Sequence, residues 1–309
     1  MSDRLLVFPY HHPSDLGIIT DLIPRCRDAK TITDPPGVVD IKEMLQKPII
    51  QQRTRIWTTH EGLPVGYMLV DDYNNLVLDF LKGFLSISLE DQVIKQAVDF
   101  LQTNLHILEE TMLDASVRED DEQRIAMLMR GGFHRQPVET LKFMKDLSQP
   151  PAETPLPEGY TLRQFKGESE LPDLVLLHQT AFDTKNLTLE HRMDIMNTSE
   201  YDPVLDVVVV APDNQLAGYI IGTIDKVSNQ LSGQMSGNLD TIAVHPEHQK
   251  KGLATCLVER ELKLIKLYGM KDASLSTSSE NVAMQRTANK TGFQLAGKRL
   301  WYSRTIRRS

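Results

Sequence analysis

The same order of local features occurs twice in this chain. Residues 55–60 and 64–70 form two short apolar runs around turn residues, and residues 205–211 and 216–221 repeat this arrangement. In each pair, the second run contains Gly-Tyr at the same place. Apolar runs that flank a short turn are typical of β-hairpins. Such a repeat restricts the chain to folds that are built from two copies of one unit.

The repeat continues beyond the hairpins. In each half a predicted strand leads into a helix that ends at Gly-Phe, at Gly132 in the first copy and at Gly292 in the second. Asp121 and Asn281 occupy matching N-cap positions, where a short polar side chain accepts a hydrogen bond from a helix amide. The two glycines suit the left-handed position that follows a helix. We infer duplication of one α+β unit; chance similarity between two α/β domains is the alternative.

A proline-rich segment separates the two copies. Residues 146–159 contain four prolines and no apolar period, which is typical of an extended linker. We therefore predict one domain at residues 1–147, a linker at 148–158 and a second domain at 159–309. Each domain is long enough to bury its own core.

Charge and composition exclude several classes of protein. The net charge is −8: residues 1–150 hold 16 Lys and Arg against 23 Asp and Glu, or −7, and residues 151–309 hold 18 against 19, or −1. Nucleic-acid binding requires a basic face, so we expect none. No apolar run approaches the roughly 18 residues that span a bilayer, and the N-terminal run is too short for a signal peptide. The two cysteines, Cys26 and Cys256, suit a reducing cytoplasm.

One segment indicates a ligand site, and it reads Gln249-Lys250-Lys251-Gly252-Leu253-Ala254. A predicted strand at residues 239–244 precedes it, and a helix with apolar residues at helical spacing begins near Gly252. The first turn of a helix has unpaired N–H groups and the positive end of the dipole. Because Gly252 has no Cβ, a ligand can approach the backbone closely. The segment predicts a pyrophosphate site. The glycine-rich loops of dinucleotide and ATP sites do not occur in the sequence.

With this segment the chain resembles the GNAT superfamily of acyl-CoA-dependent N-acetyltransferases, whose pyrophosphate loop is Q/R-x-x-G-x-G/A. Asn281 and Gly292-Phe293 follow at the spacing of later landmarks of the family, and the match covers roughly residues 159–305. The tandem arrangement is similar to that of mycothiol synthase and related two-domain acetyltransferases. The resemblance implies an α+β fold of two tandem GNAT-like domains. Each domain would have a mixed, mostly antiparallel twisted sheet flanked by helices.

The resemblance also implies the substrates: acetyl-CoA as the acyl donor and a small-molecule amine as the acceptor, with no metal. Loop amides would hold the pyrophosphate of coenzyme A, strand residues would pair with its pantetheine arm, and Asn281 would bond the same arm. The implied cofactor-binding residues are Ile242, Ala243, Val244, Gln249, Lys250, Lys251, Gly252, Leu253, Ala254, Thr255 and Asn281. The amine would attack the thioester directly, without a covalent enzyme intermediate.

Two catalytic groups are expected, a base and a proton donor. Asp240, near the start of the strand, is the candidate base, because the nearby Asn238 cannot take a proton. A solvated carboxylate at the strand end is the alternative interpretation of Asp240. Family members usually place a tyrosine proton donor four residues before the Gly of Gly-Phe, and this chain has Ala288 there. The candidate replacements are Tyr302, which we predict, and also Ser276, Ser278 and water.

The first copy lacks the pyrophosphate loop. Its matching residues, 88–96, contain no glycine, and Glu90 and Asp91 stand where the pyrophosphate would bind. Like charges repel at a closed anion site. We therefore predict that the N-terminal domain does not bind acetyl-CoA and instead shapes one wall of the acceptor cleft.

The sequence thus predicts a cytoplasmic N-acetyltransferase acting on a small-molecule amine. A non-catalytic acyl-CoA-binding or regulatory protein is the alternative that Ala288 suggests, and a pure interaction module is the third hypothesis. Phe182, Tyr201 and Trp301 are weaker candidates for the acceptor site. The sequence identifies neither the acceptor nor the oligomeric state, which leaves a homodimer open.

Overall fold

The computed structural model of the protein describes residues 5–28, 31–103, 110–198 and 201–307. By its internal contacts the chain forms two compact units. The first unit comprises Met1–Thr140, Gln230–Gly233 and Gly297–Ser309, and the second comprises Leu141–Asn229 and Gln234–Ala296. Within the described ranges, no helix has the length and apolar character needed to cross a membrane.

An antiparallel four-stranded sheet forms the centre of the first unit, in the order β1-β2-β3-β4. Its strands are β1 Leu6–Pro9, β2 Thr54–Thr58, β3 Pro64–Val70 and β4 Leu76–Phe80. The other elements are α1 Leu16–Cys26, α2 Val38–Met44, α3 Pro48–Gln52, α4 Ile87–Thr103, β5 Glu110–Arg118 and α5 Glu122–Arg130.

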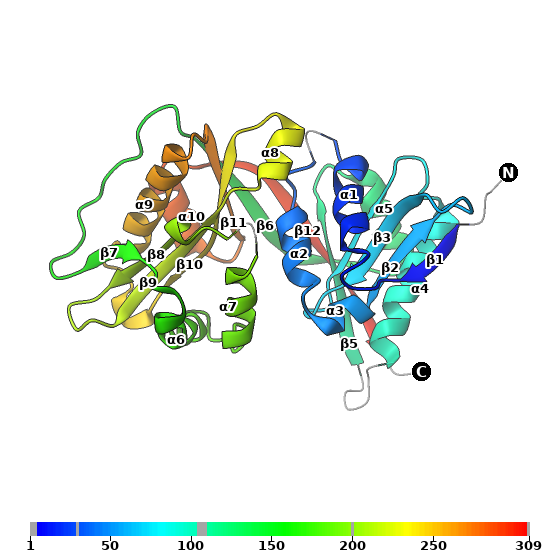
Figure 1. Cartoon of the computed structure of the whole chain (residues 1–309), viewed down its shortest axis with the longest axis horizontal. Helices are drawn as coiled ribbons and strands as arrows, with labels where there is room; N and C mark the ends of the chain where they lie inside the picture. The colour runs from blue at the N-terminus through cyan, green and yellow to red at the C-terminus, as the bar shows by residue number, and fades with distance from the viewer. Residues whose placement is uncertain (1–4, 29–30, 104–109, 199–200, 308–309) are drawn as a thin grey trace. The chain divides into compact units, whose positions relative to one another are not determined.

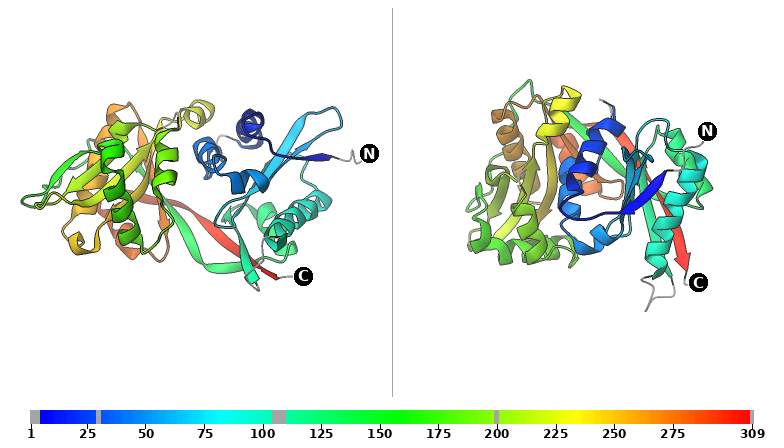
Figure 2. Two further views of the ribbon diagram at one scale, coloured as in Figure 1. Left: turned by 60° about the horizontal axis from the view of Figure 1, so that its bottom comes forward. Right: turned by 45° about the vertical axis from the view of Figure 1, so that its right-hand side comes forward.

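Alternating side chains of this sheet enter two separate cores, as the two-residue period of a strand requires. Tyr67 and Leu69 pack with residues of α1, α2 and α3, whereas Trp57 and Met68 pack with residues of α4 and α5. Figure 2 shows the helices α1–α3 and the helix α4 on opposite faces of the sheet. The first unit is therefore a sheet covered by helices on both faces.

The second unit likewise has a sheet with helices on both faces. Its sheet runs β11-β10-β9-β8-β7, and every pair is antiparallel except β10 with β11. The strands are β7 Thr161–Gln164, β8 Asp206–Val210, β9 Leu216–Thr223, β10 Ser236–Val244 and β11 Asp272–Ser278. The helices are α6 Leu171–Phe182, α7 Leu189–Met196, α9 Leu253–Leu267 and α10 Val282–Lys290. Helix α8, Lys226–Ser232, begins in this unit, and its last three residues group with the first unit. Short 3₁₀ turns occur at Gly167–Glu170, Pro203–Leu205 and Pro246–His248.

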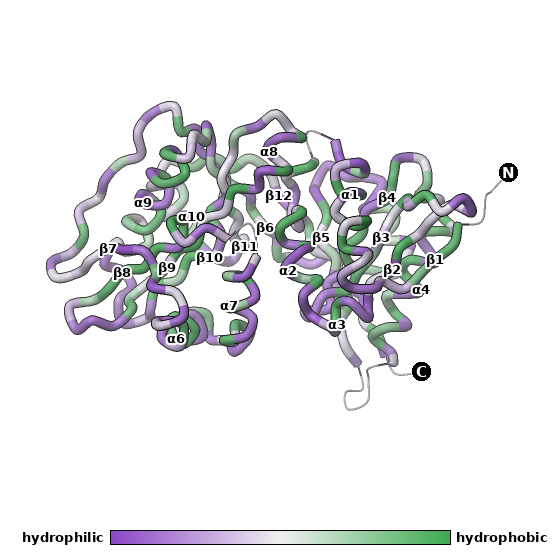
Figure 3. Tube along the Cα trace, in the orientation of Figure 1, coloured by the Kyte–Doolittle hydropathy of each residue, from purple (hydrophilic) through white to green (hydrophobic). Residues whose placement is uncertain are grey.

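The second sheet is also covered on both faces. Val208 and Tyr219 pack with α6, whereas Val207 and Ile220 pack with α9 on the other face. Figure 1 shows α9 and α6 on opposite sides of the strands. In Figure 3 the hydrophobic residues concentrate along the strands and the hydrophilic ones in the loops. The predicted α+β class with mostly antiparallel sheets is confirmed.

Two long strands, β6 His134–Asp146 and β12 Gln294–Arg307, each pass from one compact unit into the other. Their lengths, 13 and 14 residues, are about twice the usual five or six. Leu141 and Phe143 of β6 pack in the core of the second unit. Tyr302 and Ile306 of β12 pack in the core of the first unit, where β12 pairs antiparallel with β5. The compact units therefore differ from the domains predicted from the sequence, since residues 297–309 group with the first unit.

Candidate active site

Strand β10 carries an irregularity in the middle of its pairing with β9. Leu239 lies opposite Gly222 and Ile242 lies opposite Ile220, so β10 has one more residue than β9 between these two pairs. This is a β-bulge, which re-aims the local backbone and frequently occurs beside active sites. Asp240 lies in the bulge, and the strand continues through Val244.

On its other edge, β10 stops pairing with β11 where the bulge begins. Its parallel pairing with β11 runs from Ser236 opposite Asp272 to Leu239 opposite Leu275, and it stops there. The following residues of β10, Ile242 among them, pair only with β9 in the described register. An edge with unpaired backbone groups can accept an extended ligand as an additional strand.

The loop after β10 has the geometry of an anion-binding site. Lys250 and Gly252 have left-handed backbones, with φ of 62° and 84°, and α9 begins at the next residue. A Cβ at Gly252 would meet no atom within 4 Å. Among the described residues, no protein acceptor receives a hydrogen bond from the backbone N–H groups of residues 250–255. Consecutive free amides at a helix start bind phosphate groups.

Side chains hold the loop in place and add positive charge. Gln249 donates from Nε2 to the carbonyl oxygen of Val244 over 3.2 Å, which closes the turn between strand and helix. Lys251 donates from Nζ to the hydroxyl of Tyr160 over 2.9 Å, and that hydroxyl lies 2.8 Å from Nδ1 of His248. Tyr160 could not be predicted from the sequence, because it lies 91 residues from Lys251 along the chain.

The remaining cofactor-binding candidates occupy surroundings that fit their predicted roles to different degrees. The side chains of Leu253 and Thr255 are buried, so these residues can face a ligand only through their backbone. Asn281 is the N-cap of α10, where its Oδ1 accepts from the backbone N–H of Met284 over 3.0 Å. Ala288, which replaces the usual tyrosine, is fully buried in the core of the unit.

The bulge adjoins a buried pair of side chains that the sequence analysis missed. Tyr219 of β9 is buried, and its hydroxyl oxygen lies 2.7 Å from Nδ1 of His178 on α6. The pKa of Tyr219 is raised overall, mainly by burial and also by the Asp240 carboxylate. The Arg192 charge and a hydrogen bond with Thr241 act in the opposite direction. Tyr219 pairs with Ala243, the residue after Ile242, where the bulge ends. The repeated Gly-Tyr motif was the only signal in the sequence.

The α6 and α7 face of the sheet is fixed by a buried ion pair. Arg192 of α7 forms a salt bridge with Asp206 of β8, and both side chains are almost completely buried. Tyr201 donates from its hydroxyl to Asp206 Oδ2 over 2.7 Å. The ring of Phe182 lies 4.7 Å from that of His178, between centroids. Of the weaker candidates for the acceptor site, Tyr201 is thus bound to Asp206, and Phe182 lies beside His178.

The two catalytic candidates are not brought together within one unit. Asp240 is exposed on the bulge of the second unit. Tyr302 lies in the first unit, opposite Ala115, and only 5% of it is exposed within a hydrophobic core. Its strand has crossed to the other core, which sequence spacing does not reveal. The alternative Ser276 is exposed on the part of β11 that no longer pairs with β10.

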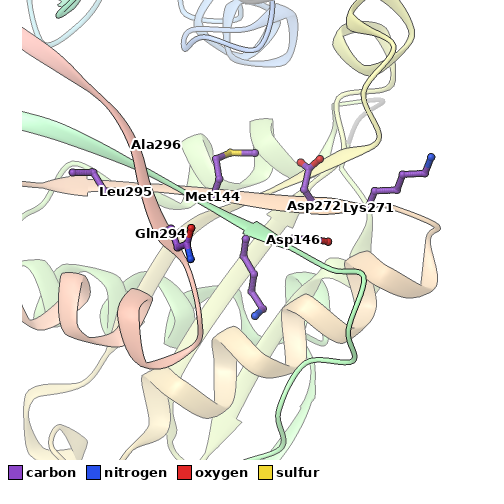
Figure 4. A pocket seen from close by; sticks show the side chains of 8 residues that line it. Met144, Asp146, Lys271, Asp272, Gln294, Leu295 and Ala296 are labelled. Atoms are coloured by element: carbon purple, nitrogen blue, oxygen red, sulfur yellow. The ribbon is translucent and has the colours of Figure 1, made fainter.

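A separate cavity of about 460 Å³ lies elsewhere in the second unit. Its walls come from β6, β12 and the start of β11, as Figure 4 shows for the side chains of Met144, Asp272 and Gln294. None of the predicted site residues lines it. Within the described part of the chain, no group of three or more His, Cys, Asp or Glu side chains is arranged to hold a metal ion.

Part of the sequence and the overall fold are similar to known acetyltransferases. Residues 172–293 match the family model described as the Acetyltransferase (GNAT) family. A search of curated proteins gives no match. Among solved structures, a GCN5-related N-acetyltransferase from Sphaerobacter thermophilus is 18% identical, with a TM-score of 0.72 over 99% of this chain and 96% of its own.

Two further structures cover the whole chain. A tandem GNAT protein from the clavulanic acid biosynthesis pathway is 17% identical, with a TM-score of 0.72 over 99% of this chain and 100% of its own. The N-myristoyltransferase of Saccharomyces cerevisiae is 13% identical, with a TM-score of 0.64 over 99% of this chain and 79% of its own. Residues 172–293 are thus similar to the GNAT acetyltransferase family, and the chain as a whole has the fold of tandem GNAT proteins.

Proposed function

We propose that this protein transfers the acetyl group of acetyl-CoA to the amine of a small molecule, in its second unit. The observation that carries the proposal is the run of six backbone amides from Lys250 to Thr255, which find no acceptor within the described part of the chain. They lie beside Gly252, around which there is open space. An isolated helix start is common in proteins. Here it follows a bulged strand with an open edge, inside a segment that is similar to an acetyltransferase family.

In this proposal acetyl-CoA binds along β10. The pyrophosphate would accept hydrogen bonds from the amides of residues 250–255, with Lys250 and Lys251 supplying positive charge. The pantetheine arm would pair with the free edge of Ile242, Ala243 and Val244, and the side-chain amide of Asn281 would bond the same arm. One amide of the bulged strand would then face the thioester carbonyl as an oxyanion donor.

The acceptor would enter from the face that α6 and α7 cover. Its nitrogen lone pair forms the new C–N bond at the thioester carbon, while the carbonyl electrons move onto the oxygen. When the intermediate collapses, the C–S bond breaks and the thiolate of coenzyme A leaves. Asp240 takes the proton from nitrogen, directly or through water. The thiolate receives its proton from the exposed Ser276 hydroxyl or from water, because Ala288 can donate none.

A pair of variants tests the binding part of this proposal. Gly252→Asp would place a carboxylate in the cradle and should abolish acetyl-CoA binding in calorimetry. Gly62→Asp is the matched control, because Gly62 also has a φ of 84° and open space around its missing Cβ. Both substitutions strain the backbone alike, so only the first should affect affinity. Equal affinity in the two variants would contradict the assignment of the loop.

A second candidate function is suggested by Ala288. A protein without the usual proton donor could bind acyl-CoA as a regulator without turning it over. The thiolate of coenzyme A leaves without a strong donor, and a general acid typically contributes about 10²–10⁴-fold, so we favour catalysis. Release of free thiol over a broad panel of amines decides between the two. Tight acetyl-CoA binding with no thiol release from any amine would favour the regulator.

A further inference from the structure

Four arginine side chains gather in the first unit, although residues 1–150 carry a net charge of −7. They come from four elements: Arg27 follows α1, Arg118 ends β5, Arg124 lies on α5 and Arg299 lies on β12. The side chains of Arg27, Arg118 and Arg299 are only 9%, 20% and 18% exposed. We call these four residues the arginine cluster.

The arginine cluster lies where β4 and β5 separate. An isolated parallel bridge joins Asn75, next to the start of β4, to Asp114 of β5. Asp79 of β4 binds Arg27 beyond this bridge, with 2.8 Å between Oδ2 and Nη2. In the duplicated plan β4 corresponds to β10 and β5 to β11, so this gap is the counterpart of the split beside the loop in the second unit.

The gap in the first unit has not kept a phosphate cradle at a helix start. The amides of Leu89 and Glu90 both donate to the carbonyl oxygen of Ser86 over 2.9 Å, so they are occupied. Glu90 forms an ion pair with Arg130, which keeps a carboxylate close to this turn. Any anion that binds in the first unit would therefore be held by the arginine side chains and not by a loop of amides.

Two members of the arginine cluster are poorly neutralised by the protein. Arg124 donates from Nη1 to the backbone carbonyl of Leu78 over 3.3 Å, and no described carboxylate pairs with its side chain. Of the carboxylates in the described ranges, Arg299 reaches Asp34 alone, at 4.0 Å, and Asp34 is also 3.3 Å from Arg118. Its other hydrogen bonds go to the hydroxyl and carbonyl oxygens of Ser116.

The partly buried arginine cluster therefore carries more positive charge than the neighbouring carboxylates neutralise. Burial lowers the pKa of Arg299, and the charges of Arg27, Arg124 and Arg118 act in the same direction against Asp34. A partly buried charge that is incompletely neutralised destabilises the fold, and guanidinium groups pair strongly with oxyanions. A ligand that supplies the missing negative charge would remove this cost.

We infer that the first unit binds the oxyanion of a small molecule, a phosphate or a carboxylate, at the arginine cluster. Arg124 and Arg299 would donate to it, while Arg27 stays bound to Asp79 and Arg118 stays bound to Asp120 and Asp34. The inference does not depend on acetyl transfer by the second unit. It assigns to the first unit a binding role in addition to the structural one expected from its sequence.

The test measures anion binding by calorimetry and thermal denaturation of the full chain. The probes are inorganic phosphate and acetate, each at an ionic strength matched with chloride. The Gly252→Asp background removes the loop of the second unit as a competing phosphate site. We expect saturable binding of at least one probe. Tighter binding of phosphate would indicate a phosphate site, and tighter binding of acetate would indicate a carboxylate site. Absence of saturable binding of either probe would overturn the inference.

Variants then locate the site. Arg124→Gln and Arg299→Gln should each weaken binding at least tenfold. Arg130→Gln is the matched control, because Arg130 lies on the same helix as Arg124 but binds Glu90 and is exposed. Without an anion, Arg124→Gln should leave the melting temperature unchanged or raised, since it removes an unbalanced charge. Binding that survives both cluster variants, or a lowered melting temperature for Arg124→Gln, would contradict the inference.

Discussion

Nδ1 of His178 lies 2.7 Å from the hydroxyl oxygen of Tyr219, which joins α6 to β9 beside the bulge of β10. Burial lowers the pKa of His178, and the nearby His191 and Arg192 act in the same direction. The imidazole is therefore neutral at pH 7, and no described residue forms a hydrogen bond with its Nε2, so this nitrogen can meet an incoming amine. In the proposed reaction this pair positions the acceptor next to Asp240.

Replacing His178 should impair the acceptor step and not the donor step. We expect His178→Gln to lower kcat/KM for the amine roughly 10- to 100-fold, since a misplacement of about 1 Å can cost 10²-fold. The dissociation constant for acetyl-CoA should stay within about twofold of the wild type. In the wild type, kcat/KM plotted against pH should decline on the acid side with a midpoint below 6.5, the ordinary pKa of histidine. The variant should lose that decline; an unchanged pH profile would contradict the positioning role.

Replacing the predicted base should lower the rate at saturating acetyl-CoA. Asp240→Asn keeps the shape of the side chain but removes its ability to accept a proton, and a general base typically contributes about 10²–10⁴-fold. Steady-state kinetics with the best amine of the panel measures this loss. Asp173→Asn, which changes an exposed carboxylate on α6, is the control and should leave the rate unchanged. Equal rates for the two variants would mean that Asp240 is a solvated carboxylate at the strand end and not the base.

The local features of this site were predictable because they depend on short stretches of sequence. The N-caps form as predicted, with Asp121 and Asn281 each accepting from the amide three residues on over 3.0 Å. Gly132 and Gly292 both adopt the left-handed conformation that ends a helix, with φ of 78° and 85°. The strand, loop and helix around Gly252 follow the same logic, since turn chemistry and apolar spacing are encoded locally.

The parts that sequence reasoning missed depend on distant contacts. His178 and Tyr219 are 41 residues apart, and only the packing of α6 on β9 brings them together. The position of Tyr302 depends on the path of β12, which leaves the core of its own copy for the other one. A periodic pattern predicts that such a strand exists but not which sheet it joins. The arginine cluster likewise collects residues from four separate elements.

Lys251 should contribute to acetyl-CoA affinity through its charge. Its contacts with Tyr160 place the ammonium group beside the loop, and we expect Lys251→Gln to weaken binding several-fold at low salt. Because the Debye length falls from about 10 Å at 0.1 M to about 3 Å at 1 M salt, the difference should shrink as salt is added. Calorimetry at the two salt concentrations measures it. Lys226→Gln, on α8, is the control substitution of a lysine outside the loop. A loss that is the same at both salt concentrations would point to packing and not to charge.

The most unusual ionisable group of the second unit is Glu261 of α9, which is fully buried. Among the described residues, neither of its carboxylate oxygens has a hydrogen-bond partner. Gly222 of β9 makes room for it, since a Cβ there would lie 2.0 Å from Oε1. Burial raises the pKa of Glu261 well above its ordinary value, and the Asp206 carboxylate acts in the same direction. The folded protein therefore favours the protonated form of this side chain.

This protonation makes stability depend on pH in a defined direction. Below the ordinary pKa of glutamate, 4.5, the folded and unfolded chains both hold the proton. Above it the unfolded chain releases the proton and the folded chain does not, so stability is lost as the pH rises toward the folded pKa. Glu261→Gln cannot ionise, so its melting temperature should exceed that of the wild type at pH 8. The advantage should fade toward pH 4.5. Glu158→Gln, an exposed change in the linker, should show no such trend. A difference between Glu261→Gln and the wild type that stays constant across this range would mean that Glu261 is ionised in the fold, with a partner that compensates its burial.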